Sequence, residues 1–168
     1  MTQAVVIMGV SGCGKSTLGR ALADALGWRF VEGDTLHPTA NIAKMASGVA
    51  LDDEDRQPFL EAVARTIAEQ RACGIVVSCS ALKREYRNLV RANAGEVTFV
   101  LPVLDRATLV DRLAQRPNHF MPATLVDSQL AALEPPDAWE QSILLDGAAP
   151  TSVQVAQAMA ALQARDRV

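Results

Sequence analysis

The sequence predicts a doubly wound α/β domain in which helices cover both faces of a parallel, five-stranded sheet. Two observations predict this fold. Short apolar runs alternate with segments of helical periodicity along the chain, and a glycine-rich loop joins the first such run to the first helical segment. Continuous apolar runs are typical of parallel strands, because helices bury both faces of such a sheet. Ligands then bind beyond the carboxyl ends of the strands, where we expect the functional residues.

Strands and helices are assigned from apolar patterning and from the residues that end each segment. Short, mainly apolar runs, the first of them β-branched, predict strands at residues 4–8, 29–31, 75–79, 97–103 and 142–145. Apolar residues three or four positions apart predict helices that include residues 18–26, 41–47, 60–67, 83–93, 109–113, 124–133 and 155–162. Gly27 and Gly48 end the first two helices. The regular alternation implies right-handed crossovers within one sheet.

Polar residues mark the starts of the later helices. An acidic stretch precedes the third predicted helix, where the positive end of the helix dipole favours carboxylates. Asp105 is a good N-cap for the helix that follows the fourth strand. Thr124 with Asp127, and Thr151 with Gln154, have the spacing of a capping box, so we expect these pairs to open the last two helices.

Length and composition are those of one ordinary globular domain that spans residues 1–168. A formal charge of −3 provides no basic field, so we expect neither DNA nor RNA as a partner. Three cysteines without CxxC spacing suggest neither disulfides nor a zinc cluster, and we expect them to be buried. The start of the chain lacks a signal-peptide pattern, and no apolar run approaches the roughly 20 residues of a membrane span, which favours a cytoplasmic location and no membrane contact.

The strongest motif is a phosphate-binding loop after the first predicted strand. Residues 9–16 read Gly-Val-Ser-Gly-Cys-Gly-Lys-Ser and match G-x-x-x-x-G-K-[ST] at every defined position. Backbone N–H groups of such a loop, with the helix that follows, bind phosphate oxygens. Lys15 then neutralises charge on the β- and γ-phosphates, and the Ser16 hydroxyl coordinates Mg²⁺. The residues expected to bind ATP are Gly9, Val10, Ser11, Gly12, Cys13, Gly14, Lys15, Ser16 and Thr17.

The loop alone does not distinguish a kinase from a GTPase or a motor ATPase, since all three share it. The N-K-x-D sequence with which GTPases recognise their base is absent, and motor ATPases need a longer chain than 168 residues. A small kinase is the interpretation that remains. The segment 143–146 has the form of a second magnesium motif, but its place at the start of the last crossover favours a turn residue for Asp146.

A second group of motifs lies after the second and third predicted strands. Residues 30–38 contain two carboxylates and an imidazole, where a kinase needs groups that orient and deprotonate an alcohol. The sequence here resembles the gluconokinase family closely, through G-D-T-L-H-P at 33–38, N-I-A-K-M-A-S-G at 41–48 and an acidic run that ends in Asp55-Arg56. The likeness continues in residues 78–87 and in His119-Phe120-Met121, and it extends from residue 6 to about 135.

The resemblance implies an activity and a more specific fold. The family as known consists of ATP-dependent kinases that make 6-phosphogluconate from D-gluconate, and it is related in fold to the shikimate kinases. This implies a P-loop NTPase domain of the nucleoside-monophosphate-kinase-like type, with an acceptor-binding segment at about 34–71 and a mobile lid at about 115–124. It also implies that Asp34 holds the acceptor hydroxyl and serves as base, and that Glu32 helps to hold Mg²⁺ through water. The family is often dimeric, and exposed apolar residues on the acceptor-side helix would suit a homodimer.

Gluconate is an anion with several hydroxyl groups, so its pocket needs at least one cation and several hydrogen-bonding groups. Arg56 matches the place of a carboxylate-binding arginine in the shikimate kinases, with a surface ion pair as its alternative role. His37 is placed to bind a hydroxyl, although a histidine before proline is also an ordinary turn residue. Ser80, Lys83 and Arg87 follow the third strand and are expected to face the same crevice, and for the two cations a solvated helix charge is the alternative.

The predicted lid supplies the last candidates. Arg112 and Arg116 lie four residues apart on one helix face, and we expect one of them over the adenine ring and the other at the phosphates. Arg116, at the lid edge, is the one expected to act in catalysis, and a solvated helix charge is again the alternative for both. His119 is either a contact to phosphate or a loop residue. The expected catalytic residues are therefore Lys15, Asp34 and Arg116.

Two features depart from the family pattern. Cys13 stands where serine is common, and Pro117-Asn118 stands where a glycine often precedes His119, which could change how the lid moves.

Two other functions stay open. One is a shikimate-like or other small-acid kinase, against which Leu36-His37-Pro38 and residues 79–83 speak. The other is a non-catalytic, nucleotide-gated binding protein, which would be expected to lack the base at Asp34.

Overall fold

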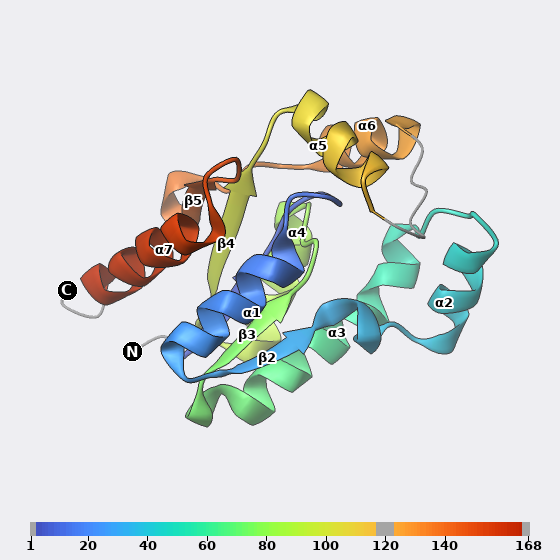
Figure 1. The fold of residues 1–168 in the computed structure, drawn as a ribbon. Helices are drawn as coiled ribbons and strands as arrows, with labels where there is room; N and C mark the ends of the chain where they lie inside the picture. Colours follow the sequence, from blue (N-terminus) through green and yellow to red (C-terminus); the bar gives the residue numbers. More distant parts are fainter. Residues whose placement is uncertain (1–2, 117–122, 166–168) are drawn as a thin grey trace.

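The computed structural model describes residues 3–116 and 123–165 of the chain. Its strands form one sheet with the order β2-β3-β1-β4-β5, and all four pairings are parallel (Figure 1). The strands are β1 (Ala4–Ile7), β2 (Arg29–Glu32), β3 (Ile75–Ser78), β4 (Thr98–Val103) and β5 (Ile143–Asp146). The predicted parallel, five-stranded sheet is confirmed, with strand ends that differ by a residue or two.

Helices follow the strands in the predicted alternation. They are α1 (Lys15–Leu26), α2 (Thr39–Ala46), α3 (Asp53–Gln70), α4 (Arg84–Ala94), α5 (Arg106–Ala114), α6 (Ala123–Ala132) and α7 (Thr151–Arg165). The described residues also contain three short 3₁₀ turns: η1 (Gly33–Leu36), η2 (Arg71–Cys73) and η3 (Ala138–Glu140).

The sheet lies between two helical layers. Helices α1 and α7 cover one face, and α3 and α4 cover the other (Figure 1). Successive residues of the central strand β1, with Met8 just after it, point to opposite faces: Val5 and Ile7 belong to the core under α1 and α7, whereas Val6 and Met8 belong to the core under α3 and α4. All four side chains are wholly buried. With both faces covered, the ends of the strands are left for binding.

Helices α5 and α6 lie beyond the carboxyl ends of the strands (Figure 1). They share a separate apolar cluster with the phosphate loop and with the loop after β3. Its buried members are Val10, Cys13, Leu82, Leu109, Leu113 and Val126. This cluster ties the two helices that flank the predicted lid to the edge where ligands are expected.

The predicted helix starts are confirmed in part. Asp105 caps α5 through a 2.7 Å bond from the Thr108 amide, and an Asp52 capping box opens α3 amid its acidic first turn. The capping box predicted at Thr124 is wrong, because α6 already begins at Ala123 and the Asp127 carboxylate pairs with an arginine of α5. The one predicted at residue 151 is also wrong, because Thr151 is the first residue of α7 and the Gln154 side chain turns to the preceding loop.

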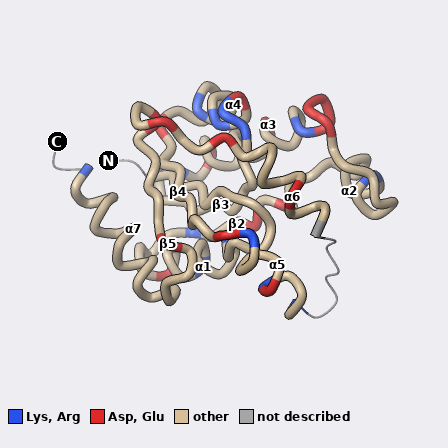
Figure 2. Tube along the Cα trace, turned by 90° about the horizontal axis from the view of Figure 1, so that it is seen from above, with Lys and Arg blue, Asp and Glu red and all other residues tan. Residues whose placement is uncertain are grey.

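Acidic and basic residues are interspersed along the chain instead of gathering in one part of it (Figure 2). Within residues 3–116 and 123–165, no helix has the length and apolar character needed to cross a membrane. Cys13 and Cys79 are buried as expected, but Cys73 is exposed because it lies in the turn η2 at the surface end of α3.

Arg87 does not face the crevice, so the predicted substrate contact is wrong. Its side chain is wholly buried and forms a two-pronged pair with buried Glu140, with Nε–Oε2 at 2.7 Å and Nη2–Oε1 at 2.8 Å. Arg91 adds a contact of 3.0 Å to the same carboxylate. The Arg87 guanidinium also donates to the carbonyls of Ala81 and Leu82, at 3.1 and 3.3 Å. The Arg87 guanidinium therefore supports the loop after β3 from the protein interior.

The buried pair predicts a difference in stability between two variants. Glu140→Gln leaves the Arg87 charge buried without its counter-charge, and removing one partner of such a pair costs about 3–5 kcal/mol. Asp127→Asn breaks an exposed pair with Arg106, which should cost less than about 1 kcal/mol. Urea unfolding at neutral pH measures both free energies of unfolding, and equal losses would contradict the prediction.

The same variant should change the response to acid. Hydrogen bonds from Arg87 are the main cause that lowers the pKa of Glu140 from 4.5 to about 2. A carboxyl group whose pKa is lowered by folding adds stability above its unfolded pKa, and this stability is lost as the pH falls from about 4.5 toward 2. The free energy of unfolding of the unmodified protein should therefore fall more steeply over this range than that of Glu140→Gln.

Candidate active site

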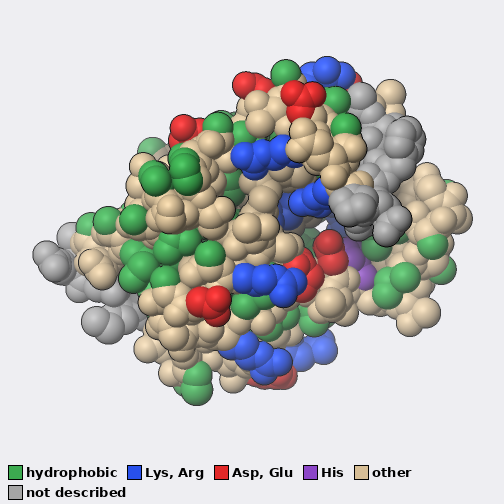
Figure 3. Space-filling view, viewed as in Figure 1, with side chains coloured by type: hydrophobic (Ala, Val, Ile, Leu, Met, Phe, Trp, Pro, Cys, Tyr) green, Lys and Arg blue, Asp and Glu red, His purple; other side chains and the backbone are tan. Residues whose placement is uncertain are grey.

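The sheet brings the phosphate loop and the loop after β3 together. Strand β1 pairs with β3 on one side and β4 on the other, and the hydrogen bonding continues past the strands. The Cys79 amide donates to the Ile7 carbonyl at 3.0 Å, and the Gly9 amide then donates to the Ser80 carbonyl, also at 3.0 Å. Figure 3 shows a hollow beside these loops, between the α5–α6 side of the molecule and the α2 side, with basic, acidic and histidine side chains at its rim.

The phosphate loop leads into a helix whose positive end is left open. Gly14 takes the N-cap position of α1 with φ 91°, no side chain caps the helix, and its first turn contains no acidic residue. By contrast, α3 and α5 are both capped by aspartates. The free N–H groups and the dipole at the start of α1 therefore remain available to an anion such as phosphate.

Lys15 and Ser16 lie where the phosphate loop runs into α1. The Lys15 ammonium donates to the carbonyls of Gly9 and Val10, at 2.9 and 3.0 Å, so it lies along the loop. Ser16 follows in the first turn of α1 and is half-buried. The loop thus presents one cation and one hydroxyl next to its backbone N–H groups.

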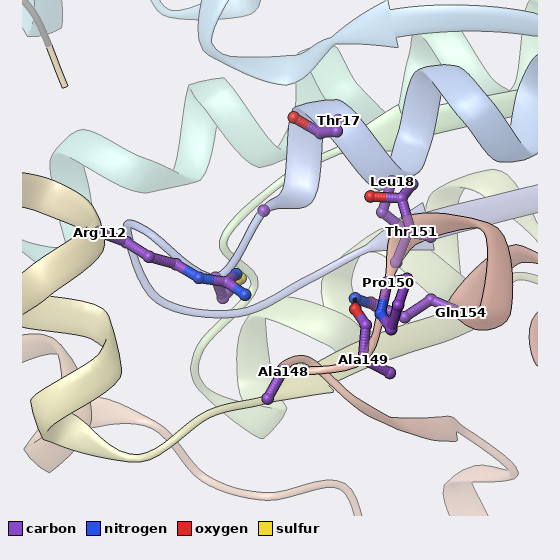
Figure 4. Close-up of a pocket in the computed structure, with 10 residues that line it drawn as sticks. Thr17, Leu18, Arg112, Ala148, Ala149, Pro150, Thr151 and Gln154 are labelled. Carbon is purple, nitrogen blue, oxygen red and sulfur yellow. Dashed lines mark hydrogen bonds between the residues drawn. The ribbon is translucent and has the colours of Figure 1, made fainter. Parts of the chain in front are cut away.

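A pocket of about 350 Å³ opens between the phosphate loop, α5 and the loop after β5 (Figure 4). Arg112 of α5 reaches across it, and its Nη2 donates to the Gly147 carbonyl at 2.9 Å. From the other side, the buried Gln154 of α7 donates to the carbonyls of Gly147 and Ala149, at 3.3 and 2.8 Å. The volume lies within the range of small-ligand sites. The pocket brings Arg112 together with Cys13, Gly14 and Thr17 of the predicted nucleotide site.

The loop after β5 was missed by reasoning from the sequence. Residues 148–150 line the pocket, yet Ala-Ala-Pro carries no side-chain chemistry that a motif could reveal. The available signal was topological, because a loop that follows a parallel strand lies at the same edge as the phosphate loop. Asp146 is a turn residue, as predicted: its carboxylate accepts from the Ala148 amide at 2.9 Å.

Close contact between β2 and β3 sets the direction of the acceptor segment. A Cβ atom on Gly33 would lie 1.9 Å from the Ser78 carbonyl oxygen, so no other residue fits there without moving the backbone. The Ser78 hydroxyl donates to the Glu32 carboxylate and accepts from the Gly33 amide at 3.2 Å. Glu32 also lies 3.7 Å from Arg20. Its carboxylate is therefore oriented at the end of β2, and Asp34 follows in an exposed turn.

His37 is held in one orientation and one tautomer. Its ring stacks on Phe59, with the ring centroids 3.7 Å apart. The Asn41 amide nitrogen donates to the Asp55 carbonyl at 2.7 Å and lies 3.3 Å from His37 Nδ1, so Nδ1 acts as the acceptor and Nε2 carries the proton. Burial lowers the pKa of His37, and the Arg56 charge lowers it further while Asp34 opposes the shift. His37 therefore offers a neutral N–H donor at neutral pH.

Lys15 and Asp34 lie at the same edge of the sheet, on the two sides of β3. The Gly9 amide at the start of the phosphate loop donates to the Ser80 carbonyl, and Gly33, next to Asp34, packs on Ser78. Cys79 lies between these two contacts and is buried, and burial is the main cause that raises the pKa of its thiol to about 12.

Lys83 and Arg56 differ in their partners. The Lys83 ammonium lies 2.9 and 3.2 Å from the two carboxylate oxygens of Asp53, and the Tyr86 hydroxyl donates to the same carboxylate. The Arg56 guanidinium lies 5.6 Å from the centroid of the Tyr86 ring, and its Nε donates weakly to the Leu51 carbonyl at 3.4 Å. No carboxylate within the described residues pairs with Arg56. Arg56 therefore has more charge available for an anionic ligand than Lys83 has.

The predicted lid can be described only at its edges. Arg116 follows the end of α5 and is exposed, and its amide donates to the Leu113 carbonyl at 3.3 Å. The segment Pro117-Asn118, together with His119, Phe120 and Met121, lies outside the described residues.

Known proteins resemble this chain over most of its length. A family model described as an AAA domain matches residues 5–136. A gluconokinase of Gluconobacter oxydans (strain 621H) is 44% identical over 164 residues, which cover 96% of this chain and 92% of the relative. The chain belongs to the gluconokinase family.

Solved structures extend the likeness from sequence to fold. The crystal structure of a gluconokinase from Sinorhizobium meliloti 1021 matches with a TM-score of 0.87 and 43% sequence identity. The match covers 95% of this chain and 91% of the gluconokinase chain. The shikimate kinase of Aquifex aeolicus matches with a TM-score of 0.63 at 17% sequence identity, over 97% of this chain and 98% of the shikimate kinase chain. At this identity the likeness shows a shared fold alone. The P-loop kinase fold and the gluconokinase resemblance predicted from the sequence are confirmed.

The pocket geometry leads to a prediction for Arg112. Arg112→Met removes both the cation and the bond to the Gly147 carbonyl, so we expect ADP to bind about tenfold more weakly, as for the loss of one good cation contact. Arg106→Met on the same helix, which breaks an exposed pair with Asp127, is the matched control and should leave affinity unchanged. Titration calorimetry with ADP measures both, and equal affinities for the two variants would refute the assignment.

Proposed function

We propose that this member of the gluconokinase family transfers the γ-phosphoryl group of Mg-ATP to the terminal hydroxyl of D-gluconate, giving 6-phospho-D-gluconate and ADP. The observation that carries the proposal is that the phosphate loop with Lys15 and the segment with Asp34 flank the end of β3, while Arg56, near the start of α3, pairs with no carboxylate among the described residues. These charges match a donor phosphate, a reacting hydroxyl and an acceptor carboxylate. The names of the relatives in the family supply the substrate.

The reaction needs little covalent chemistry from the protein. The hydroxyl oxygen of the acceptor forms a bond to the γ-phosphorus, the bond from that phosphorus to the bridging oxygen of ADP breaks, and the hydroxyl proton passes to the Asp34 carboxylate. Lys15 and the N–H groups at the start of α1 stabilise the phosphate charge. Arg112 holds the nucleotide in its pocket, and Arg116 approaches the moving phosphoryl group from the lid edge.

The residues present fit a magnesium ion. Mg²⁺ prefers oxygen ligands and keeps several waters, so one or two protein groups beside the phosphates suffice. We propose that the Ser16 hydroxyl binds it directly and that the Glu32 carboxylate, oriented by Ser78, acts through water. When bound, Mg²⁺ offsets negative charge on the β- and γ-phosphate oxygens.

For the acceptor we propose that Arg56 binds the carboxylate of gluconate. It lacks a carboxylate partner within the described ranges, whereas Lys83 already has Asp53. His37 donates its Nε2–H to a hydroxyl, in keeping with its fixed tautomer and lowered pKa. Ser80, whose carbonyl accepts from Gly9, and Lys83 complete the acceptor side at the mouth of the hollow. Arg87 has no part in it.

Further proposals concern the surroundings of the protein. We propose a cytoplasmic enzyme that acts on a small molecule without nucleic-acid or membrane partners, in keeping with the net charge of −3 and the interspersed acidic and basic residues. A homodimer through the acceptor side is supported by three apolar side chains on and after α2, Ile42, Met45 and Val49, which are 51%, 43% and 50% exposed.

The base gives the direct test of the proposed function. Asp34→Asn keeps the size of the side chain but cannot accept the proton, so gluconate-dependent ADP release should fall about 10²- to 10⁴-fold. ADP affinity should be unchanged, because Asp34 lies on the acceptor side. Asp24→Asn, at an exposed position of α1, is the control. The assay offers D-gluconate, shikimate, other aldonates or no acceptor.

The outcomes separate the alternatives. Turnover with shikimate or another acid in place of gluconate would favour another small-acid kinase. Nucleotide binding without turnover on any acid would favour the nucleotide-gated binding protein. Full activity of Asp34→Asn would refute the base.

A substitution of Arg56 should change the KM for gluconate but not the KM for ATP. Arg56→Met removes the proposed partner of the gluconate carboxylate, so the KM for gluconate should rise about tenfold or more while the KM for ATP stays the same. Lys83→Met should have a smaller effect, because Asp53 already offsets the charge of Lys83. Steady-state kinetics with each substrate varied in turn measures both, and the reverse order of effects would assign the carboxylate to Lys83.

A further inference from the structure

One residue of α6, the helix that follows the predicted lid, forms a double contact with the phosphate loop. The side-chain oxygen of Gln129, on α6, accepts from the Ser11 backbone N–H at 2.7 Å, and its side-chain nitrogen donates to the Ser11 hydroxyl at 3.2 Å. One carboxamide therefore binds the backbone and the side chain of the same residue. The two residues are 118 positions apart, and both are half-buried.

Ser11 is the third residue of the phosphate-binding motif. The N–H groups of this loop form the cradle for the phosphates, so their directions decide where the γ-phosphate lies. A contact that fixes both Ser11 groups therefore acts on the donor side of the reaction, and it comes from a helix outside the motif.

The chain leaving α6 contacts the acceptor side at Glu134, two residues after the helix ends. The Glu134 amide donates to the Leu82 carbonyl at 2.8 Å, and the Glu134 carboxylate accepts from the Arg84 amide at 2.6 Å. Arg84 is the first residue of α4, whose N-cap residue Lys83 makes no side-chain cap of its own. Glu134 thus caps α4 from outside, and it holds the loop that carries Ser80 and Lys83.

Apolar packing joins the two polar contacts. Val126 of α6 is buried in one cluster with Val10 and Leu82, and Leu130 and Leu133 pack against the same cluster. Val10 belongs to the phosphate loop and Leu82 to the acceptor loop. The segment 126–134 therefore lies against both loops and touches each of them by apolar and by polar contacts.

We propose that Gln129 and Glu134 are positioning residues that set the separation between the γ-phosphate and the acceptor hydroxyl. The inference rests on the proposed function. Transfer between two bound substrates depends steeply on this separation, and a displacement of about 1 Å can cost about 10²-fold in rate. When the acceptor is misplaced, water can attack instead: its oxygen bonds to the γ-phosphorus, the bond to ADP breaks, and inorganic phosphate and a proton leave.

The test measures coupling as well as rate. ADP and 6-phosphogluconate are quantified in the same reaction for the unmodified protein, Gln129→Ala and Glu134→Ala. We expect kcat to fall about 10- to 100-fold and the ratio of ADP to 6-phosphogluconate to rise above one in both variants. Glu134→Gln should restore coupling, because its amide oxygen still accepts from the Arg84 N–H.

Matched controls separate positioning from stability. Gln157→Ala on the exposed side of α7 and Glu61→Ala on α3 remove the same residue types away from the site. A purely structural role would lower the melting temperature and the active fraction but leave the ratio at one. Coupled turnover with unchanged kcat in both variants would overturn the inference. Failure of the proposed function would appear separately, as absence of gluconate-dependent turnover in the unmodified protein.

Discussion

The hydrogen bond from the Gly9 amide to the Ser80 carbonyl, 3.0 Å long, joins the two loops on which the site depends. It continues the β1–β3 pairing past the ends of the strands, where Ile7 lies opposite Ser78. The strand order places β1 between β3 and β4, so the donor loop emerges in the middle of the edge, with the acceptor loop on one side and the nucleotide pocket on the other.

At this edge of the sheet, some charged groups are neutralised by neighbours in the protein and others are left available to ligands. Helices α3 and α5 neutralise their own N-termini with aspartates, whereas α1 begins at a glycine without a cap. The open positive end and Lys15 therefore suit phosphate, while Asp34 supplies negative charge across the β3 end. On the acceptor side, Asp53 offsets Lys83 and leaves Arg56 for an anion. Arg87, which the sequence suggested as a substrate contact like Lys83, is instead paired with buried Glu140 and supports the acceptor loop.

Most of the fold and part of the site could be predicted from the sequence, for reasons that are local. The phosphate loop, the strands and the Asp105 cap each depend on residues within one segment, and the motif around Asp34 and His37 is contiguous. The features that were missed depend on partners far apart in the chain: Arg87 and Glu140 are 53 residues apart, and Ser11 and Gln129 are 118. An arginine beside an active-site loop and a glutamine on a helix have many possible roles, and only the packing decides among them. The pocket residues 148–150 were missed because they contribute shape and backbone without distinctive side chains.

The central claim is that the groups at this edge of the sheet transfer the γ-phosphoryl group of Mg-ATP to the terminal hydroxyl of gluconate. Phosphorus NMR of the purified protein with Mg-ATP and D-gluconate tests it most directly, because the spectrum identifies the bond that forms. We expect the γ-phosphate signal to be replaced by one phosphomonoester signal, split into a triplet by the two protons of the terminal carbon, in equal amount to the ADP produced. Growth of inorganic phosphate alone, or a phosphomonoester coupled to a single proton, would contradict the proposed transfer.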